Sequence, residues 1–198
     1  MQKEELLQMI KQLQLDDTIA IESIPNLDLY MDQVITLFEE KLGHTKRYEE
    51  DKLLTKTMIN NYTKAKLLMP AVKKKYTKEH ILLMILLYDL KQILMIGDIK
   101  TLFGTIIKDG QVNSELLAET YQLFTELKVE GAYQFQGEVE KIEESIASKI
   151  ETIPIAEGIE VNQLISMIQV ILLTEKANYY KRLAEKIMDE KLANKVSH

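Results

Sequence analysis

The stretch Leu54–Tyr76, LTKTMINNYTKAKLLMPAVKKKY, combines helix-spaced apolar residues with many lysines in an otherwise acidic chain. Between Thr45 and His80 there are ten Lys or Arg residues and four Asp or Glu residues. The whole chain has 25 basic and 31 acidic residues, so the remainder carries 15 against 27. One cationic region on an acidic protein is typical of a surface that binds a polyanion such as nucleic acid.

The composition predicts a globular protein without a resident cofactor. The chain has 198 residues, of which 46% are hydrophobic, enough for one fair-sized core or two small ones. It has no cysteine and only three scattered histidines, so we expect no disulfide, metal or organic cofactor. The N-terminal segment lacks the basic-then-apolar order of a signal peptide, and no apolar run reaches the roughly 20 residues of a membrane span. We therefore expect a cytoplasmic protein that does not enter the membrane.

Apolar residues recur at three- and four-residue spacing along almost the whole chain, which predicts an all-α fold. Thr55 and Thr77 are the predicted N-caps of a short helix ending at Lys64 and of a long buried helix ending at Met95. Between them, Val72–Tyr76 could form one short strand. The other helices expected in this first region, residues 1–110, are residues 3–13, residues 29–42 and a short helix that begins at Gly97 and Asp98 and stops near Gly110.

Residues 111–198 form a second predicted region of long, acidic, amphipathic helices. We expect one helix before Gly131, a second over residues 135–153 and a last one over residues 161–193. The apolar stripe of the last helix is too long for a small domain to bury by itself. It could pack on residues 135–153 within the chain or form a homodimer interface, and the sequence leaves both arrangements open.

The candidate DNA-binding residues lie in the quoted stretch. A helix capped by Thr55 places Lys56, Asn60 and Lys64 one turn apart on one face, whereas Met58, Ile59, Tyr62 and Ala65 point away from it. Lysine can bind phosphate or guanine, and asparagine can pair with adenine. The lysine triplet that follows suits a hairpin-like wing along a phosphate backbone. The full predicted set is Lys56, Thr57, Asn60, Asn61, Lys64, Lys73, Lys74, Lys75 and Tyr76.

The order of these features resembles the winged helix-turn-helix of the MerR superfamily of bacterial transcription regulators. The resemblance covers Leu54–Phe103: a capped helix with Tyr62, the string Leu67-Leu68-Met69-Pro70, the basic wing Lys73–Lys75, Tyr76-Thr77 opening a long helix, and Ile96-Gly97-Asp98-Ile99-Lys100. It implies a dimeric regulator that binds double-stranded DNA and pairs through C-terminal helices. The string from Ile24 to Phe103 is also similar to a bacterial family of unknown function, which implies no activity.

The sequence departs from the MerR pattern at several points. Lys66 stands where a glycine is usual, Asn60-Asn61 replaces an Arg-Tyr pair, and the wing is several residues shorter. The loop Gly43–Leu53 also lengthens the turn before the recognition helix. Residues 29–42 can support that helix only if this loop folds back.

Two other function classes compete with DNA binding. An enzyme would need converging carboxylates, but Glu138, Glu140, Glu143 and Glu144 have the spacing of a solvated face, and no phosphate loop or nucleophile motif occurs. We therefore expect no catalysis. A helical protein-interaction module could instead use the helix-turn-helix scaffold without binding DNA. In that case the C-terminal region would cover the recognition face, whereas a DNA-binding protein would leave it open.

Overall fold

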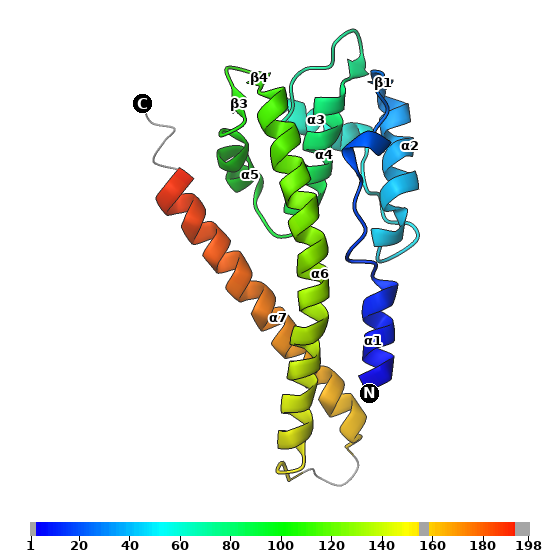
Figure 1. The fold of residues 1–198 in the computed structure, drawn as a ribbon, viewed down its shortest axis with the longest axis vertical. Coiled ribbons are helices and arrows are strands. Elements are labelled where there is room, and N and C mark those ends of the chain that lie inside the picture. Colours follow the sequence, from blue (N-terminus) through cyan, green and yellow to red (C-terminus); the bar gives the residue numbers. More distant parts are fainter. Residues whose placement is uncertain (1–2, 155–158, 193–198) are drawn as a thin grey trace. The chain divides into compact units, whose positions relative to one another are not determined.

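The computed structural model describes residues 3–154 and 159–192, which are mostly helical, as predicted (Figure 1). Short helical turns lie at Ile21–Ser23 (η1) and Gly43–Thr45 (η2), and a π-helical turn at Met188–Leu192 (η3). The described α-helices and strands, in chain order, are α1 (Lys3–Gln12), β1 (Leu29–Tyr30), α2 (Met31–Leu42), α3 (Lys56–Lys64), β2 (Lys75–Tyr76), α4 (Lys78–Leu90), α5 (Ile96–Phe103), β3 (Ile107–Lys108), β4 (Gln111–Val112), α6 (Ser114–Ile150) and α7 (Val161–Ile187).

The described residues form two compact units. The head unit comprises residues 18–126 and 184–192, and the long-helix unit comprises residues 3–17, 127–154 and 159–183. Helix α6 contributes its first part to the head unit and its second part to the long-helix unit. The expected domains, residues 1–110 and 111–198, stay a prediction.

Helix α4 is the centre of the head unit. All seven residues from Ile81 to Leu87 are buried, so this helix has no polar face, and it lies among the other helices of the head unit (Figure 1). The hydroxyl of Tyr121 in α6 donates a hydrogen bond to the carbonyl oxygen of Ile19 at 2.7 Å and so holds the segment before β1. The buried residues that other elements contribute include Val34 and Phe38 from α2, Ile59 and Tyr62 from α3, Ile99 and Phe103 from α5, and Leu117 from α6.

The segment before α2 is a short strand, whereas we predicted a helix from Leu29. Strand β1 pairs antiparallel with β2, with Leu29 opposite Tyr76 and Tyr30 opposite Lys75. The backbone N–H of Tyr30 donates to the side-chain oxygen of Gln33 at 2.8 Å, so the helix begins only at Met31. This pairing ties the start of α2 to the end of the predicted wing.

A buried histidine caps the start of α4. The backbone N–H of Thr77 donates to His80 Nδ1 at 3.1 Å, so that nitrogen is an acceptor and the proton is on Nε2, which donates to the Met69 carbonyl oxygen at 3.2 Å. His80 is only 2% exposed, and this burial lowers the pKa of its imidazole. The cap therefore requires a neutral side chain.

We expect His80 to make the head unit less stable in acid. Below about pH 6.5 the unfolded chain binds a proton that the folded imidazole resists, so the free energy of unfolding falls with pH, by up to about 1.4 kcal/mol per pH unit. His80→Gln keeps an acceptor for Thr77 and should flatten this dependence in denaturant titrations at several pH values. His44→Gln changes a histidine that is not in the core and serves as the control. An unchanged pH slope in His80→Gln would contradict this account.

Two other predicted boundaries were wrong. Helix α4 ends at Leu90 rather than Met95. Met95 is instead the N-cap residue of α5, and its N–H donates to Asp98 Oδ2 at 3.3 Å. Gly131 does not end a helix, since α6 continues through it to Ile150. A single glycine costs a helix only about 1 kcal/mol, which a long helix tolerates.

The long-helix unit is an intramolecular helical hairpin, one of the two arrangements that the sequence left open. Val139, Ile146 and Ile150 of α6 are buried. Gln169 of α7 donates a hydrogen bond to Glu143 of α6. Further polar contacts pair Lys176 with Glu138 at 3.8 Å and bring the Tyr180 hydroxyl 3.4 Å from the same carboxylate.

Among the described residues, no helix has both the length and the apolar character needed to cross a bilayer.

Candidate nucleic-acid interface

Helix α3 separates its residues into a buried and an exposed face, as predicted. Thr55 caps the helix, because the N–H of Met58 donates to its Oγ1 at 3.1 Å. Ile59 and Tyr62 are buried in the head core. The exposed face, called the recognition face below, consists of Lys56, Thr57, Asn60, Asn61 and Lys64.

The turn after α3 explains one departure from the MerR pattern. The N–H of Leu67 donates to the Tyr62 carbonyl at 2.9 Å, and the N–H of Lys66 donates to the Thr63 carbonyl at 3.0 Å. These two bonds form a Schellman motif, in which the residue after the C-cap has a left-handed conformation. Lys66 occupies that position with φ of 62°. The chain thus keeps a backbone conformation that favours glycine but has a lysine there.

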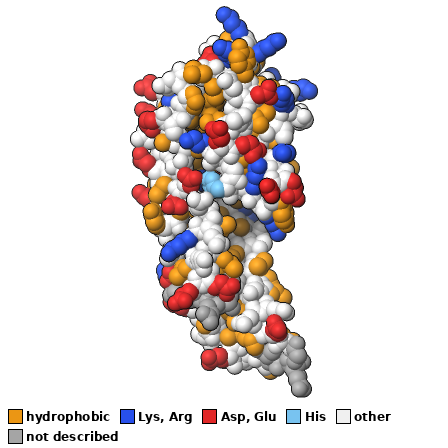
Figure 2. All heavy atoms as spheres, turned by 90° about the vertical axis from the view of Figure 1, so that its right-hand side faces the viewer, with side chains coloured by type: hydrophobic (Ala, Val, Ile, Leu, Met, Phe, Trp, Pro, Cys, Tyr) orange, Lys and Arg blue, Asp and Glu red, His pale blue; other side chains and the backbone are white. Residues whose placement is uncertain are grey.

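The predicted wing is a tight hairpin with lysines at its tip. Val72 and Lys75 exchange two backbone hydrogen bonds of 3.0 and 2.9 Å. The two residues between them, Lys73 and Lys74, have φ of 50° and 65°, which matches a type I′ turn. Both are exposed, and Figure 2 shows Lys and Arg side chains gathered at the upper end of the displayed face.

A second hairpin in the head unit shows what this turn normally requires. Strands β3 and β4 are joined by Asp109 and Gly110, whose φ values of 51° and 76° match the same turn type. Asp-Gly is a preferred pair for a type I′ turn, and this dipeptide could have revealed the hairpin from sequence. Lys-Lys has no such preference, so turn geometry does not account for the lysines of the wing.

The other two predicted wing residues have different environments. The Lys75 ammonium lies 5.1 Å from the centre of the Tyr30 ring, in a cation–π arrangement. Tyr76 is 4% exposed, its ring meets that of His80 edge to face at 5.5 Å, and burial raises the pKa of its hydroxyl. Tyr76 therefore anchors the wing in the core, and Lys73 and Lys74 are its exposed cations.

An acidic residue outside the predicted set lies beside the recognition face. Lys56 Nζ lies 2.7 Å from Asp32 Oδ1, in the first turn of α2. Both side chains are largely exposed, so the ion pair contributes little to stability. Any phosphate or base that Lys56 binds must compete with this carboxylate. No local pattern in the sequence joins these residues, because they lie on different helices.

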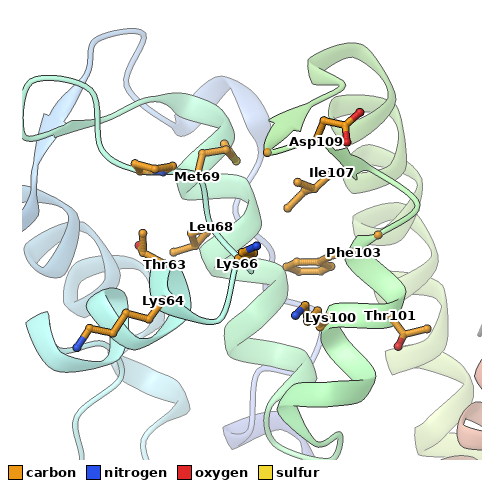
Figure 3. Close-up of a pocket in the computed structure, with 13 residues that line it drawn as sticks. Thr63, Lys64, Lys66, Leu68, Met69, Lys100, Thr101, Phe103, Ile107 and Asp109 are labelled. Atoms are coloured by element: carbon orange, nitrogen blue, oxygen red, sulfur yellow. The ribbon is translucent and has the colours of Figure 1, made fainter. Parts of the chain in front are cut away.

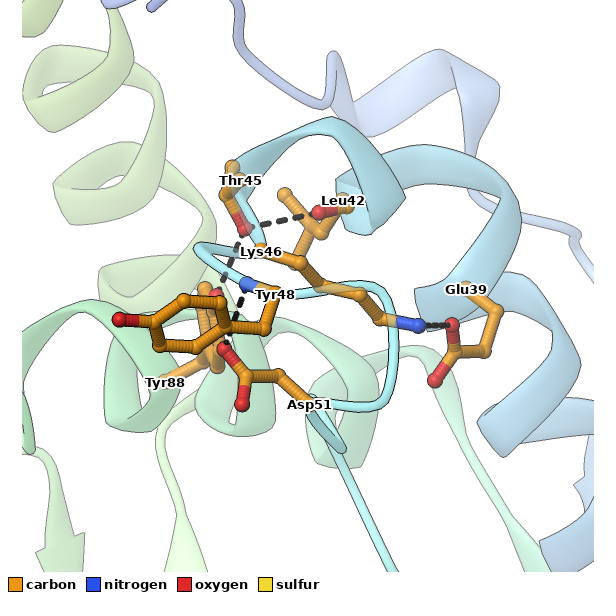
Figure 4. A network of polar contacts seen from close by, with 7 residues as sticks. All are labelled: Glu39, Leu42, Thr45, Lys46, Tyr48, Asp51 and Tyr88. Atoms are coloured by element: carbon orange, nitrogen blue, oxygen red, sulfur yellow. Dashed lines mark hydrogen bonds and ion pairs between the residues drawn. The ribbon is translucent and has the colours of Figure 1, made fainter.

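The long loop between α2 and α3 folds back, which is the condition for α2 to support α3 (Figure 4). Thr45 Oγ1 donates to the Leu42 carbonyl oxygen at 2.7 Å and also lies 2.6 Å from the Tyr88 hydroxyl of α4. Lys46 forms an ion pair with Glu39 of α2.

The far end of this loop is held by α4. Lys91, which follows α4, donates to the Leu53 carbonyl oxygen at 3.3 Å, and partial burial lowers the pKa of its ammonium. Leu53 and Leu54 are buried directly before the Thr55 cap. The loop is therefore held at both ends, and its far end leads directly into the start of α3.

Within residues 3–154 and 159–192, no three His, Asp or Glu side chains are grouped so that they could hold a metal ion.

A family model described as Domain of unknown function (DUF1836) matches residues 19–124, which is more than half of the chain. The expected similarity to a family of unknown function is thus confirmed over a longer stretch than Ile24–Phe103. No match is found among the curated proteins or among the solved structures.

Proposed function

We propose that this chain, which belongs to the family described as Domain of unknown function (DUF1836), is a cytoplasmic transcription regulator that binds double-stranded DNA. In this proposal the head unit acts as a MerR-like winged helix-turn-helix, and no catalytic step is involved. One observation supports it: all five polar residues of the recognition face are exposed, and no described residue of the head unit covers them. The protein-interaction alternative would have that face covered.

The chemistry of the two exposed regions suits different parts of a duplex. Asn60 and Asn61 offer amides that can pair with adenine in the major groove, and Lys56 and Lys64 can bind guanine or phosphate. Lys73 and Lys74 at the wing tip present only ammonium groups, which suit phosphates. We therefore propose that α3 reads sequence and that the wing supplies affinity that does not depend on sequence.

We also propose that two copies associate through the long-helix unit. The intramolecular hairpin leaves large apolar side chains of α7 more than half exposed, and extended apolar surface of this kind marks interaction sites. A symmetric dimer would bury the same surface of both copies and would present two recognition helices to two half-sites. The exposed α7 side chains are Met167, Val170, Ile171, Tyr179 and Leu183.

Sedimentation analysis tests the dimer. The wild type should sediment as a dimer at concentrations on the order of tens of micromolar, and Ile171→Glu with Leu183→Glu should give a folded monomer because both sites are exposed within one copy. Ile171→Val with Leu183→Met keeps both exposed sites apolar and should leave the dimer intact. A monomeric wild type would exclude the two-half-site model.

Selection from a random DNA pool tests DNA binding itself. The full chain should enrich a defined sequence, and its affinity for that sequence should fall as salt rises, because phosphate contacts release counterions. If the chain enriches no sequence and binds no DNA at low salt, the proposal of a DNA-binding regulator is excluded. The exposed apolar surface of α7 would then favour the second candidate function, a helical protein-interaction module.

A further inference from the structure

The head unit contains a cavity of about 830 Å³ at the C-terminal end of α3, where Lys64 of the recognition face is one of its lining residues (Figure 3). Its walls come from the last turn of α3, the segment 66–70, helix α5 and the β3–β4 hairpin. This volume lies within the range of about 300–1,000 Å³ that is usual for small-molecule sites. The cavity is large enough for a small ligand of one or two rings.

The cavity has an apolar floor. Leu68 and Phe103 are each 3% exposed at its base, and Met69 and Ile107 are half-buried on its sides. Figure 3 shows the Phe103 ring directed into the space between the two walls. A flat aromatic or aliphatic group placed there would leave water and contact these side chains.

The rim of the cavity is cationic. Lys64, Lys66 and Lys100 line it together with a single carboxylate, Asp109, although the chain as a whole has a net charge of −6. In the described part of the chain, none of the three lysines forms an ion pair. Figure 3 shows the Lys64 ammonium directed away from the cavity, whereas Lys66 lies over it near Phe103.

Lys66 is placed at the rim by the left-handed turn that ends α3. A residue with a side chain costs about 1 kcal/mol or more in this conformation, which glycine adopts freely. The presence of lysine where glycine is favoured therefore brings an ammonium group to the cavity at a cost to folding.

We infer that this cavity is a binding site for a small amphipathic anion, an aromatic or aliphatic body that carries a carboxylate or a phosphate. The apolar part contacts Phe103, Leu68 and Met69, and the anionic group is bound by Lys66 and Lys100. The site does not depend on DNA binding, and no residue of the wing contributes to it.

An NMR titration of the full chain with labelled methionine methyl groups tests the site, using 2-naphthoate as the probe. Met69 lines the cavity, whereas Met9 and Met167 are exposed in the long-helix unit. The Met69 signal should shift and saturate, and the other two should stay unchanged. The neutral 2-naphthamide should bind at least about tenfold more weakly, because it lacks the charge that the lysines bind.

Two variants separate binding from folding. Lys66→Gly relieves the backbone strain, so it should raise the thermal unfolding midpoint and yet weaken 2-naphthoate binding about tenfold. Lys100→Gln should weaken binding similarly. Equal binding of the acid and the amide, undiminished binding by both variants, or equal shifts at Met9 and Met69 would each overturn the inference.

Discussion

Replacing Lys56 and Asn60 with Ala is expected to weaken binding to the selected DNA sequence by about 1–3 kcal/mol for each base that is no longer recognised, or roughly 5- to 150-fold. Binding to a scrambled duplex should change much less, since random sequence gives these side chains few specific partners. Both residues are exposed on α3, and Ala is the better helix former, so the fold should be unaffected. Fluorescence anisotropy with the two duplexes at equal salt measures the specificity ratio.

Asp32→Asn is the matched variant with the opposite expectation. It removes the carboxylate that holds Lys56 and that would repel a nearby phosphate. Affinity for both duplexes should therefore rise, with little change in stability, because the ion pair is exposed. Equal losses on both duplexes from Lys56→Ala and Asn60→Ala would show that α3 is only a cationic patch.

Replacing both residues of the wing tip, Lys73→Asn together with Lys74→Gly, should weaken binding to all DNA sequences to the same extent. If both lysines bind phosphates, the slope of log affinity against log salt should fall by about 0.9 for each phosphate that the variant no longer neutralises, or nearly 2 per protomer. Sequence preference should survive, because the recognition face is unchanged.

The same double variant should stabilise the fold. Asn-Gly is a preferred type I′ pair, whereas Lys73 and Lys74 both have positive φ. A rise in the thermal unfolding midpoint together with weaker DNA binding would show that the lysine charges of the wing contribute to DNA binding and not to the stability of the fold. Lys73→Ala with Lys74→Ala removes the charges but keeps the strain, and should weaken DNA binding equally without the gain in stability. An unchanged salt slope in both variants would exclude wing contacts with phosphate.

The features that the sequence predicted well depend on neighbouring residues. The cap at Thr55 and the two faces of α3 follow from spacing and local chemistry, which a single sequence records. The single strand expected over Val72–Tyr76 was wrong, because Lys73 and Lys74 form a turn and only Lys75–Tyr76 is a strand. The end of α4 was misjudged because its residues are buried on all sides, and such a helix has no stripe to mark where it stops.

Features that depend on distant residues could not be predicted in this way. The Asp32–Lys56 ion pair and the contact of Thr45 with Tyr88 join segments that come together only in the folded chain. The cavity above Phe103 likewise needs α3, α5 and the β3–β4 hairpin in place. No periodic pattern indicates where three such elements leave space between them.

The order of the head unit's segments along the chain affects how this unit folds during synthesis on the ribosome. The turn η3 packs against α5, and its Met188 is buried although it lies far along the chain. Residues 19–124 emerge first, and translation at about 5–20 residues per second delays Met188 by several seconds after α5 has appeared. During that interval the surface of α5 that receives η3 has no partner from its own chain. The nascent head must therefore wait for a contact of high sequence separation, the kind that slows folding most.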